Sequence, residues 1–264
     1  MRAPQLIPDA VRPGGRWLLV DGSEQSYVDV DDPTHLEFEY VQMIAYVVES
    51  VLRPAKPVTA LHLGGGLCTL PRWLAQRHPR SQQLVAERSR EIAAMAQSLG
   101  EIDGVTIAVD DAVRVLSAYP SGAADLVVCD LYDGPETVPV LFPLDRMAQL
   151  RGTLRRGGTC AVNLSDASPF DFSRVVAATM SAVFGGLVLL AEPAVLRGRR
   201  SGNVVLAGRA SGFPIAALTR RAAAGPVRAR VVAGEELADF VGDALPAGVE
   251  ADLPPSAESL GQFR

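Results

Sequence analysis

Between residues 58 and 208, short apolar segments alternate with segments of helical periodicity, and this alternation constrains the fold more than any other feature. The strand-like segments are VTALHL, QQLVAE, VTIAV, ADLVVCD and GTCAVNL. Each is followed by a helix-like segment, in turn LPRWLAQR, REIAAMAQSL, AVRVLSAY, LDRMAQLRGTL and FSRVVAATMSAVF, and the strands LVLLA and NVVLAG close the series. This pattern predicts an α/β, doubly wound and mostly parallel sheet with helices on both faces.

The segments on either side of this series predict two extensions. Residues 16–30, RWLLVDGSEQSYVDV, are typical of two short strands around a turn, and an amphipathic helix over 37–52 follows them. After residue 212 the chain is rich in Ala, Arg, Pro and Gly. We therefore expect a β-hairpin extension over 1–35, a Rossmann-like domain over 36–212 and a C-terminal extension over 213–264 with a flexible end.

Composition excludes several classes of partner. The 264 residues are 48% hydrophobic and carry a formal net charge of −5, which argues against a nucleic-acid binder or a protein of anionic membranes. Three cysteines without close spacing predict neither a disulfide framework nor a metal site. The longest uncharged run, residues 175–191, is shorter than the roughly 20 residues of a membrane span. With no signal-peptide pattern at the start, we expect a cytoplasmic protein.

The residues at the ends of the first two strands of the series predict a ligand-binding site. Ligands of open α/β sheets bind at the carboxyl ends of the strands. Gly64, Gly65 and Gly66 follow the first strand, where glycines let the backbone N–H groups approach a ligand. Glu87 ends the second strand, at the spacing of an acid that accepts both hydroxyls of a ribose.

Carboxylates also follow the third and fourth strands. Asp110 and Asp111 are placed to bind an adenine amino group, and Asp130 ends the fourth strand, three residues before Asp133. The glycine loop lacks both the GxGxxG pattern and a P-loop lysine, which favours an adenosyl sulfonium ligand over NAD or ATP. His62, in the first strand, is interpreted as a buried structural histidine.

Four stretches resemble motifs of the spermidine synthases, the polyamine aminopropyltransferases. LLVDGSEQ resembles the family's LxLDGxxQ, and LEFEYVQMIA resembles DEFxYHEMxA. LHLGGGLCTL resembles IGGGDGGTLRE, and VVCDLYDGPETVPVLF resembles VDSSDPxGPAxxLF. The motifs keep the family's order, and the resemblance covers about residues 16–210.

The resemblance implies a Rossmann-like methyltransferase fold with a small N-terminal β-strand domain, and a site that transfers an aminopropyl group from decarboxylated S-adenosylmethionine to a small amine. By position, Asp130 matches the catalytic Asp, and Asp133, Tyr40 and Gln25 match residues that bind the acceptor. Gly64, Gly65, Gly66, Glu87, Asp110 and Asp111 would bind the adenosyl group. The resemblance implies no metal, and it implies a homo-oligomer, a dimer or tetramer, formed through the N-terminal strands.

Five positions depart from the family motifs. Leu67 replaces an acid after the glycines, where we expect the side chain to face the amine of the donor's tail, and Cys68 replaces the next glycine, which has more backbone freedom. Val41 replaces a His or Gln, Ser89 replaces an acid, and Arg199 or Arg200 replaces a Tyr beside the acceptor. With carboxylates lost and arginines gained, we expect a less cationic acceptor and little preference for the decarboxylated donor.

Two other functions remain open from the residues. An S-adenosylmethionine-dependent methyltransferase of a small molecule would use the same fold and the same adenosyl pocket. A non-catalytic adenosyl-binding homologue would explain the missing acid at residue 67, although Asp130 and Asp133 argue against it.

Overall fold

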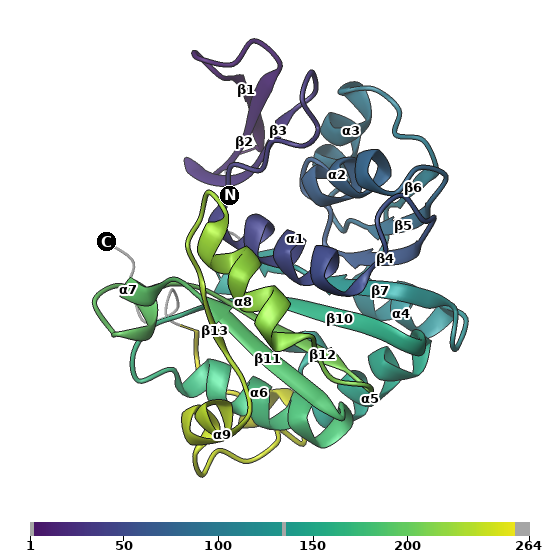
Figure 1. Ribbon diagram of the computed structural model, residues 1–264. Helices are drawn as coiled ribbons and strands as arrows, with labels where there is room; N and C mark the ends of the chain where they lie inside the picture. Colours follow the sequence, from purple (N-terminus) through teal and green to yellow (C-terminus); the bar gives the residue numbers. More distant parts are fainter. Residues whose placement is uncertain (1–2, 134–135, 257–264) are drawn as a thin grey trace.

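The computed structural model describes residues 3–133 and 136–256, and of residues 133 and 136 it describes the backbone alone (Figure 1). Two sheets organise this part of the chain, a small one near the N-terminus and a large one that spans the rest. Together they confirm the predicted α/β fold with a small N-terminal β-strand domain.

The large sheet has eight strands in the order β13-β11-β12-β10-β7-β4-β5-β6. The five strands from β10 to β6 pair in parallel, and β12, β11 and β13 extend the sheet by antiparallel pairing. The bounds are β4 (Thr59–Leu63), β5 (Gln82–Ala86), β6 (Val105–Ala108), β7 (Ala124–Cys129), β10 (Leu154–Asp166), β11 (Gly186–Ala191), β12 (Gly202–Arg209) and β13 (Arg230–Val232).

Helices cover both faces of this sheet, as the alternation predicted. They are α1 (Glu39–Val51), α2 (Thr69–Arg77), α3 (Arg90–Ser98), α4 (Ala112–Ala118), α5 (Leu144–Thr153), α6 (Asp171–Val183), α7 (Pro193–Leu196), α8 (Ile215–Ala224) and α9 (Glu235–Val241), with single 3-10 turns at Pro139–Leu141 and Glu250–Asp252. α1 and α8 lie on one face, and α4, α5, α6 and α9 lie on the other (Figure 1).

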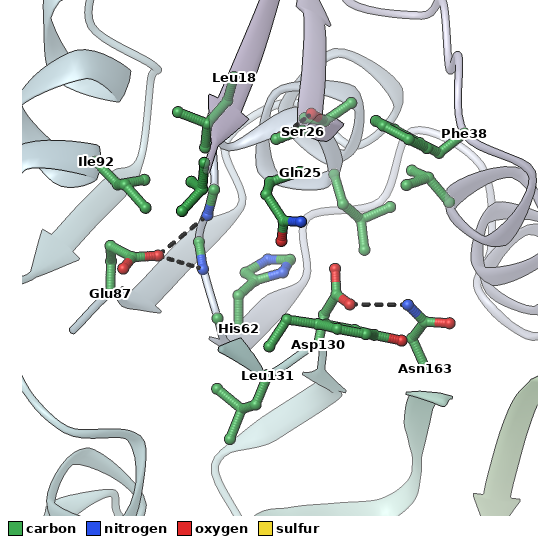
Figure 2. Close-up of a pocket in the computed structure, with 18 of the residues that line it drawn as sticks. Leu18, Gln25, Ser26, Phe38, His62, Glu87, Ile92, Asp130, Leu131 and Asn163 are labelled. Atoms are coloured by element: carbon green, nitrogen blue, oxygen red, sulfur yellow. Dashed lines mark hydrogen bonds between the residues drawn. The ribbon is translucent and has the colours of Figure 1, made fainter. Parts of the chain in front are cut away.

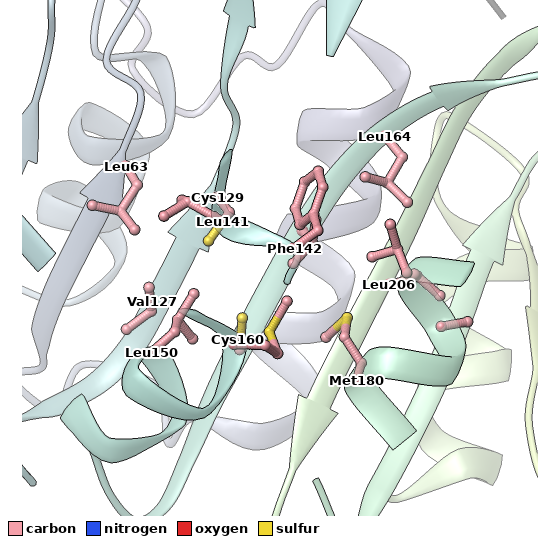
Figure 3. Packing of buried hydrophobic residues seen from close by; sticks show 14 of the residues in the cluster. Leu63, Val127, Cys129, Leu141, Phe142, Leu150, Cys160, Leu164, Met180 and Leu206 are labelled. Carbon is pink, nitrogen blue, oxygen red and sulfur yellow. The ribbon is translucent and has the colours of Figure 1, made fainter. Parts of the chain in front are cut away.

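The buried face toward α5 and α6 shows why the strands read as continuous apolar runs. Cys129 and Cys160 lie there among aliphatic side chains such as Leu150 of α5 and Met180 of α6 (Figure 3). Both cysteines are at most 1% exposed and unbridged, so Cys129 is a core residue as expected. The side chain of the next residue, Asp130, belongs to the opposite face because side chains alternate along a strand.

The small sheet has three antiparallel strands, β1 (Gln5–Pro8), β2 (Gly15–Val20) and β3 (Ser23–Asp29). β2 and β3 flank the predicted turn, whose Asp21 and Gly22 both have positive φ. β1 was not predicted, since its four residues carry no alternation of their own and depend on pairing with β2. A two-stranded ribbon, β8 (Tyr132–Asp133) and β9 (Glu136–Thr137), follows β7.

The C-terminal extension contains two helices, α8 and α9, and also β13, which adds an unpredicted edge strand to the large sheet. No helix in the described part of the chain is long and apolar enough to cross a membrane. The predicted flexible end falls largely on residues 257–264, outside the described residues.

Candidate functional site

The glycine loop joins β4 to α2 at the centre of the sheet's carboxyl edge. Gly64 has φ +101°, and a Cβ there would lie 2.0 Å from the carbonyl oxygen of Asp130. A Cβ on Gly65 would lie 2.9 Å from Cγ1 of Val85. The loop is therefore packed against the neighbouring strands β7 and β5, and side chains are excluded from it on steric grounds.

Leu67 turns away from this edge, so the prediction that it faces a bound donor is wrong. Its side chain is fully buried and packs with Leu18 and Val28 of the small sheet. Its backbone N–H donates to Oγ of Ser26 at 3.1 Å. Cys68 follows in the left-handed conformation, with φ 60°, at the start of α2. The small sheet, packed over the loop, determines the side on which Leu67 lies.

Glu87 binds the glycine loop directly. Its Oε2 accepts hydrogen bonds from the N–H groups of Gly65 and Gly66, each at 3.2 Å, and its Oε1 accepts one from Ser89 at 2.8 Å (Figure 2). Ser89 is also the N-cap of α3, since its Oγ accepts the N–H of Ile92. Ser89 thus has a structural role where the family motif has a second acid.

The two acids after β6 differ in their surroundings. Asp111 lines the cavity at this edge, and its carboxylate caps α4 by accepting the N–H groups of Val113 and Arg114. Asp110 pairs with Nε of Arg114 at 3.3 Å and is not among the residues that line the cavity. Asp111 therefore lines the cavity, whereas its neighbour Asp110 does not.

Asp130 follows the last residue of β7 and is partly buried on the wall of the cavity. Its Oδ1 accepts a hydrogen bond from the side-chain amide of Asn163 at 2.9 Å (Figure 2). Burial raises the pKa of Asp130 above its usual value, and hydrogen bonds from Asn163 and Tyr40 act in the opposite direction. Such a carboxyl holds a proton more readily than an exposed one.

Tyr40 and Gln25 reach the same cavity from two other elements. Tyr40 comes from the first turn of α1, where burial and the charge of Asp130 raise the pKa of its hydroxyl well above the ordinary value. The hydroxyl thus remains a hydrogen-bond donor. Gln25 comes from β3 of the small sheet. The side chain of Asp133, predicted to bind the acceptor, lies outside the described residues.

These groups surround a cavity of about 1010 Å³ between the two sheets. Among the described residues, it brings together Gln25, Tyr40, Gly64, Gly65, Gly66, Glu87, Asp111 and Asp130. Its charged lining consists of the carboxylates of Glu24, Glu39, Glu87, Glu91, Asp111 and Asp130 and the guanidinium groups of Arg88 and Arg200. Six carboxylates and two guanidinium groups thus line the described part of this cavity.

Arg200 lines the cavity, as the motif comparison predicted for one of the two arginines, but it is not an isolated positive charge. Its guanidinium pairs with Glu192 and donates to the carbonyl of Ser201. Arg199, the alternative, is exposed and does not line the cavity. Within the described residues, no group of three or more His, Cys, Asp or Glu side chains could hold a metal ion.

Three lining residues were missed as site residues: His62, Asn163 and Asn203. Asn203 donates to the side-chain oxygen of Asn163 at 3.2 Å, so the two amides form a chain that ends on Asp130. Asn163 stands near the end of a predicted strand, and the strand-end rule that selected Asp130 would have selected it too.

Solved structures resemble this chain over most of its length. A probable spermidine synthase from Corynebacterium glutamicum has a TM-score of 0.87 and 27% sequence identity, covering 93% of this chain and 92% of that one. A spermidine synthase in complex with the transition state analogue AdoDATO has a TM-score of 0.58 at 16% identity, covering 78% and 70%. Human methyltransferase-like protein 13, in complex with SAH, has a TM-score of 0.56 at 18% identity, covering 78% and 93%.

The second and third of these likenesses show the fold alone, whereas the first extends across both sheets. No protein-family profile matches the chain, and no curated protein does. The four motifs contribute residues to the walls of one cavity, and the likeness to a probable spermidine synthase confirms the resemblance stated from the sequence.

Proposed function

We propose that this chain is a transferase that moves an aminopropyl group from decarboxylated S-adenosylmethionine to a small amine. The observation that carries the proposal is Asp130, a partly buried carboxyl with a raised pKa that lines the cavity directly beside the glycine loop. The likeness to a probable spermidine synthase over nearly the whole chain supports the same reaction.

The adenosyl group of the donor would bind at the glycine loop. Glu87 is held there by backbone N–H groups, with its carboxylate on the cavity wall, where the two hydroxyls of a ribose can bind it. Asp111 lies on the same wall and is the candidate for the adenine amino group. Relatives of the same fold bind SAH and AdoDATO, which supports an adenosyl ligand.

The transfer needs a neutral amine, because an ammonium has no lone pair with which to attack. Asp130 would accept the proton of the incoming ammonium, and the hydroxyl of Tyr40 would keep the carboxylate oriented. The amine nitrogen then forms a bond to the aminopropyl carbon as the carbon–sulfur bond breaks. Methylthioadenosine leaves as a neutral thioether, so positioning supplies much of the rate enhancement.

The acceptor would approach from the side of the small sheet. Gln25 and Tyr40 lie on that part of the wall, and Asp133 is proposed as a further contact from its position in the motif. The carboxylates of the lining suit a cationic amine, since a buried ammonium needs a nearby opposite charge.

The open edge of the small sheet at β1 is the proposed contact between copies of this chain, which sedimentation analysis would test.

The test is an assay of aminopropyl transfer from decarboxylated S-adenosylmethionine to a panel of mono- and diamines, with methylthioadenosine as the measured product. Asp130→Asn should lower turnover by roughly 100-fold or more, the usual scale for a general base, and leave methylthioadenosine binding intact. Asp125→Asn is the matched control. Asp125 lies at the other end of β7, bonded to the N–H of Thr59 and to Arg155.

A wild-type protein that forms no methylthioadenosine with any amine contradicts the proposal. Transfer of a labelled methyl group from S-adenosylmethionine to the same amines would instead identify a methyltransferase. Full turnover in Asp130→Asn would remove the assigned role of Asp130 while leaving the reaction in place.

A further inference from the structure

His62 is a buried histidine whose two ring nitrogens have different surroundings. It lies in β4, is 2% exposed, and its Nε2 is 2.9 Å from Oε1 of Gln83. Gln83 is held in this orientation because its Nε2 donates to the carbonyl of Pro71 at 3.0 Å. An amide oxygen only accepts, so Nε2 of His62 must carry the hydrogen.

The other nitrogen, Nδ1, is consequently the one with the free lone pair. Burial lowers the pKa of His62 to about 4, so the ring is neutral at physiological pH. The ring lines the cavity, and Figure 2 shows it between Glu87 and Asp130 in the view. No hydrogen bond to Nδ1 from the described part of the chain accompanies the one at Nε2.

The cavity wall around His62 is mixed. Val128 of β7 pairs with His62 in register, and the polar side chains of Gln25 and Asp130 lie beside the ring in the view of Figure 2. Within the described residues, the hydrogen bond of the ring is the one from Nε2 to Gln83. Nδ1 therefore presents a free lone pair at the cavity wall. A ligand that brings an N–H group to this wall would satisfy it.

The position of His62 indicates which part of the donor would supply this N–H group. His62 lies two residues before Gly64, on the strand that carries the glycine loop, so it is near the point where the donor's tail leaves the adenosyl group. Leu67, the position expected to meet the amine of that tail, is buried under the small sheet instead. His62 therefore offers a hydrogen-bond acceptor that the loop itself lacks.

We propose that Nδ1 of His62 accepts a hydrogen bond from the amino group on the side chain of the adenosyl donor. The inference rests on the proposed function and adds a specificity residue to it. His62 pairs in register with Val128, so it lies on the same face of the sheet as Asp130, the proposed base on the neighbouring strand. Decarboxylated and intact S-adenosylmethionine share this amine, so His62 binds both donors. Methylthioadenosine lacks the amine and makes no such bond.

Nitrogen-15 NMR of protein labelled at histidine tests the proposal directly. The chain has only three histidines, so His62→Val assigns the Nδ1 resonance by its loss. Saturation with methylthioadenosine should leave Nδ1 close to its position in the free protein. Decarboxylated S-adenosylmethionine should move it in the direction of a hydrogen-bonded acceptor nitrogen. An equal response to both ligands, or to neither, overturns the proposal.

Affinities provide a second readout. His62→Val should weaken binding of decarboxylated and intact S-adenosylmethionine about tenfold, the scale of a hydrogen bond to a charged group, and leave methylthioadenosine unchanged. His62→Gln, which restores an acceptor oxygen, should recover part of the loss. His78→Gln is the control, because it removes another buried histidine, bonded to the carbonyl of Lys56, away from the cavity.

The outcomes separate this inference from the proposed function. If wild-type protein forms methylthioadenosine from the decarboxylated donor but its Nδ1 resonance does not respond, His62 is excluded and the transferase proposal stands. If none of the three adenosyl ligands binds, both proposals fail. If His62→Val does not fold, the NMR titration of wild-type protein and the His62→Gln affinities still decide the matter.

Discussion

The two ends of the cavity hold their acids in different ways. At the adenosyl end, Glu87 is held by three backbone N–H groups, from Gly65, Gly66 and Ser89. At the reaction end, Asp130 is held by side chains from distant segments, Asn163 on β10 and Tyr40 on α1. One acid depends on the path of the main chain and the other on the identity of individual residues.

This difference assigns the two ends different vulnerabilities. Backbone donors survive most substitutions, so the adenosyl end should tolerate changes around Glu87 and lose function when Glu87 itself is replaced. At the reaction end, hydrogen bonds from neighbouring side chains shift the pKa of Asp130. A change in one of these side chains should therefore shift the pH dependence of the reaction. Substitutions at each end, and at the loop between them, can test this contrast.

The largest effect is expected at Leu67, which the structure places outside both ends of the cavity. Leu67→Asp would bury a carboxylate against Leu18 and Val28 without a partner, and should lower the free energy of unfolding by about 3–5 kcal/mol. Leu67→Met, similar in volume, should cost less than about 1.5 kcal/mol. Urea unfolding monitored by circular dichroism measures both.

A stable Leu67→Asp variant would change the assignment of residues at the reaction end. If Leu67→Asp keeps its stability and gains a preference for decarboxylated over intact S-adenosylmethionine, residue 67 faces the donor after all. That outcome would also weaken the case for His62.

At the adenosyl end, Glu87→Ala should weaken methylthioadenosine binding by about 1–3 kcal/mol, because the ribose hydroxyls lose their acceptor and the loop N–H groups lose theirs. Calorimetric titration measures the loss. Glu101→Ala, an exposed acid outside the cavity, is the control and should bind normally. Unchanged affinity in Glu87→Ala would separate Glu87 from the ligand and leave it a purely structural contact of the loop.

The same contrast explains what could be predicted from the sequence. The glycine loop, Glu87 and Asp130 follow from strand ends and spacing, because the carboxyl ends of parallel strands meet at one edge. The direction of Leu67 depends on packing with Leu18 and Val28 of the small sheet, which lies far earlier in the chain. His62 was predicted to be buried and hydrogen-bonded, which is confirmed, but only the orientation of Gln83 shows which nitrogen is left free.

At the reaction end, Asn163→Leu removes the amide that donates to Asp130 and keeps a side chain of similar size. Burial already raises the pKa of Asp130, and the lost hydrogen bond was one of the two that opposed the rise, so the pKa should increase further. The reaction needs the deprotonated carboxylate, so the acid limb of the pH–rate profile should move to higher pH. At a pH on that limb, turnover should fall by up to roughly tenfold, the equivalent of one pKa unit.

The higher pKa of Asp130 in Asn163→Leu should also change how the free energy of unfolding depends on pH. A carboxyl whose pKa is higher in the folded than in the unfolded protein costs stability as the pH rises through those two values. The cost is absent below the pKa of the unfolded state, where the carboxyl is protonated in both. The unfolding free energy of Asn163→Leu should therefore decline more steeply than that of wild type above about pH 4. Urea unfolding across the pH range measures it.

The control for this experiment comes from the same strand. Ser165 lies two residues beyond Asn163, and its buried Oγ has no hydrogen-bond partner within the described residues. Ser165→Ala thus removes a buried polar atom without touching Asp130, and should leave the acid limb where wild type has it. A limb that moves equally in both variants would reflect general loosening of β10. A limb that moves in neither would show that the main chain, as at Glu87, sets the protonation of Asp130, and the contrast between the two ends would collapse.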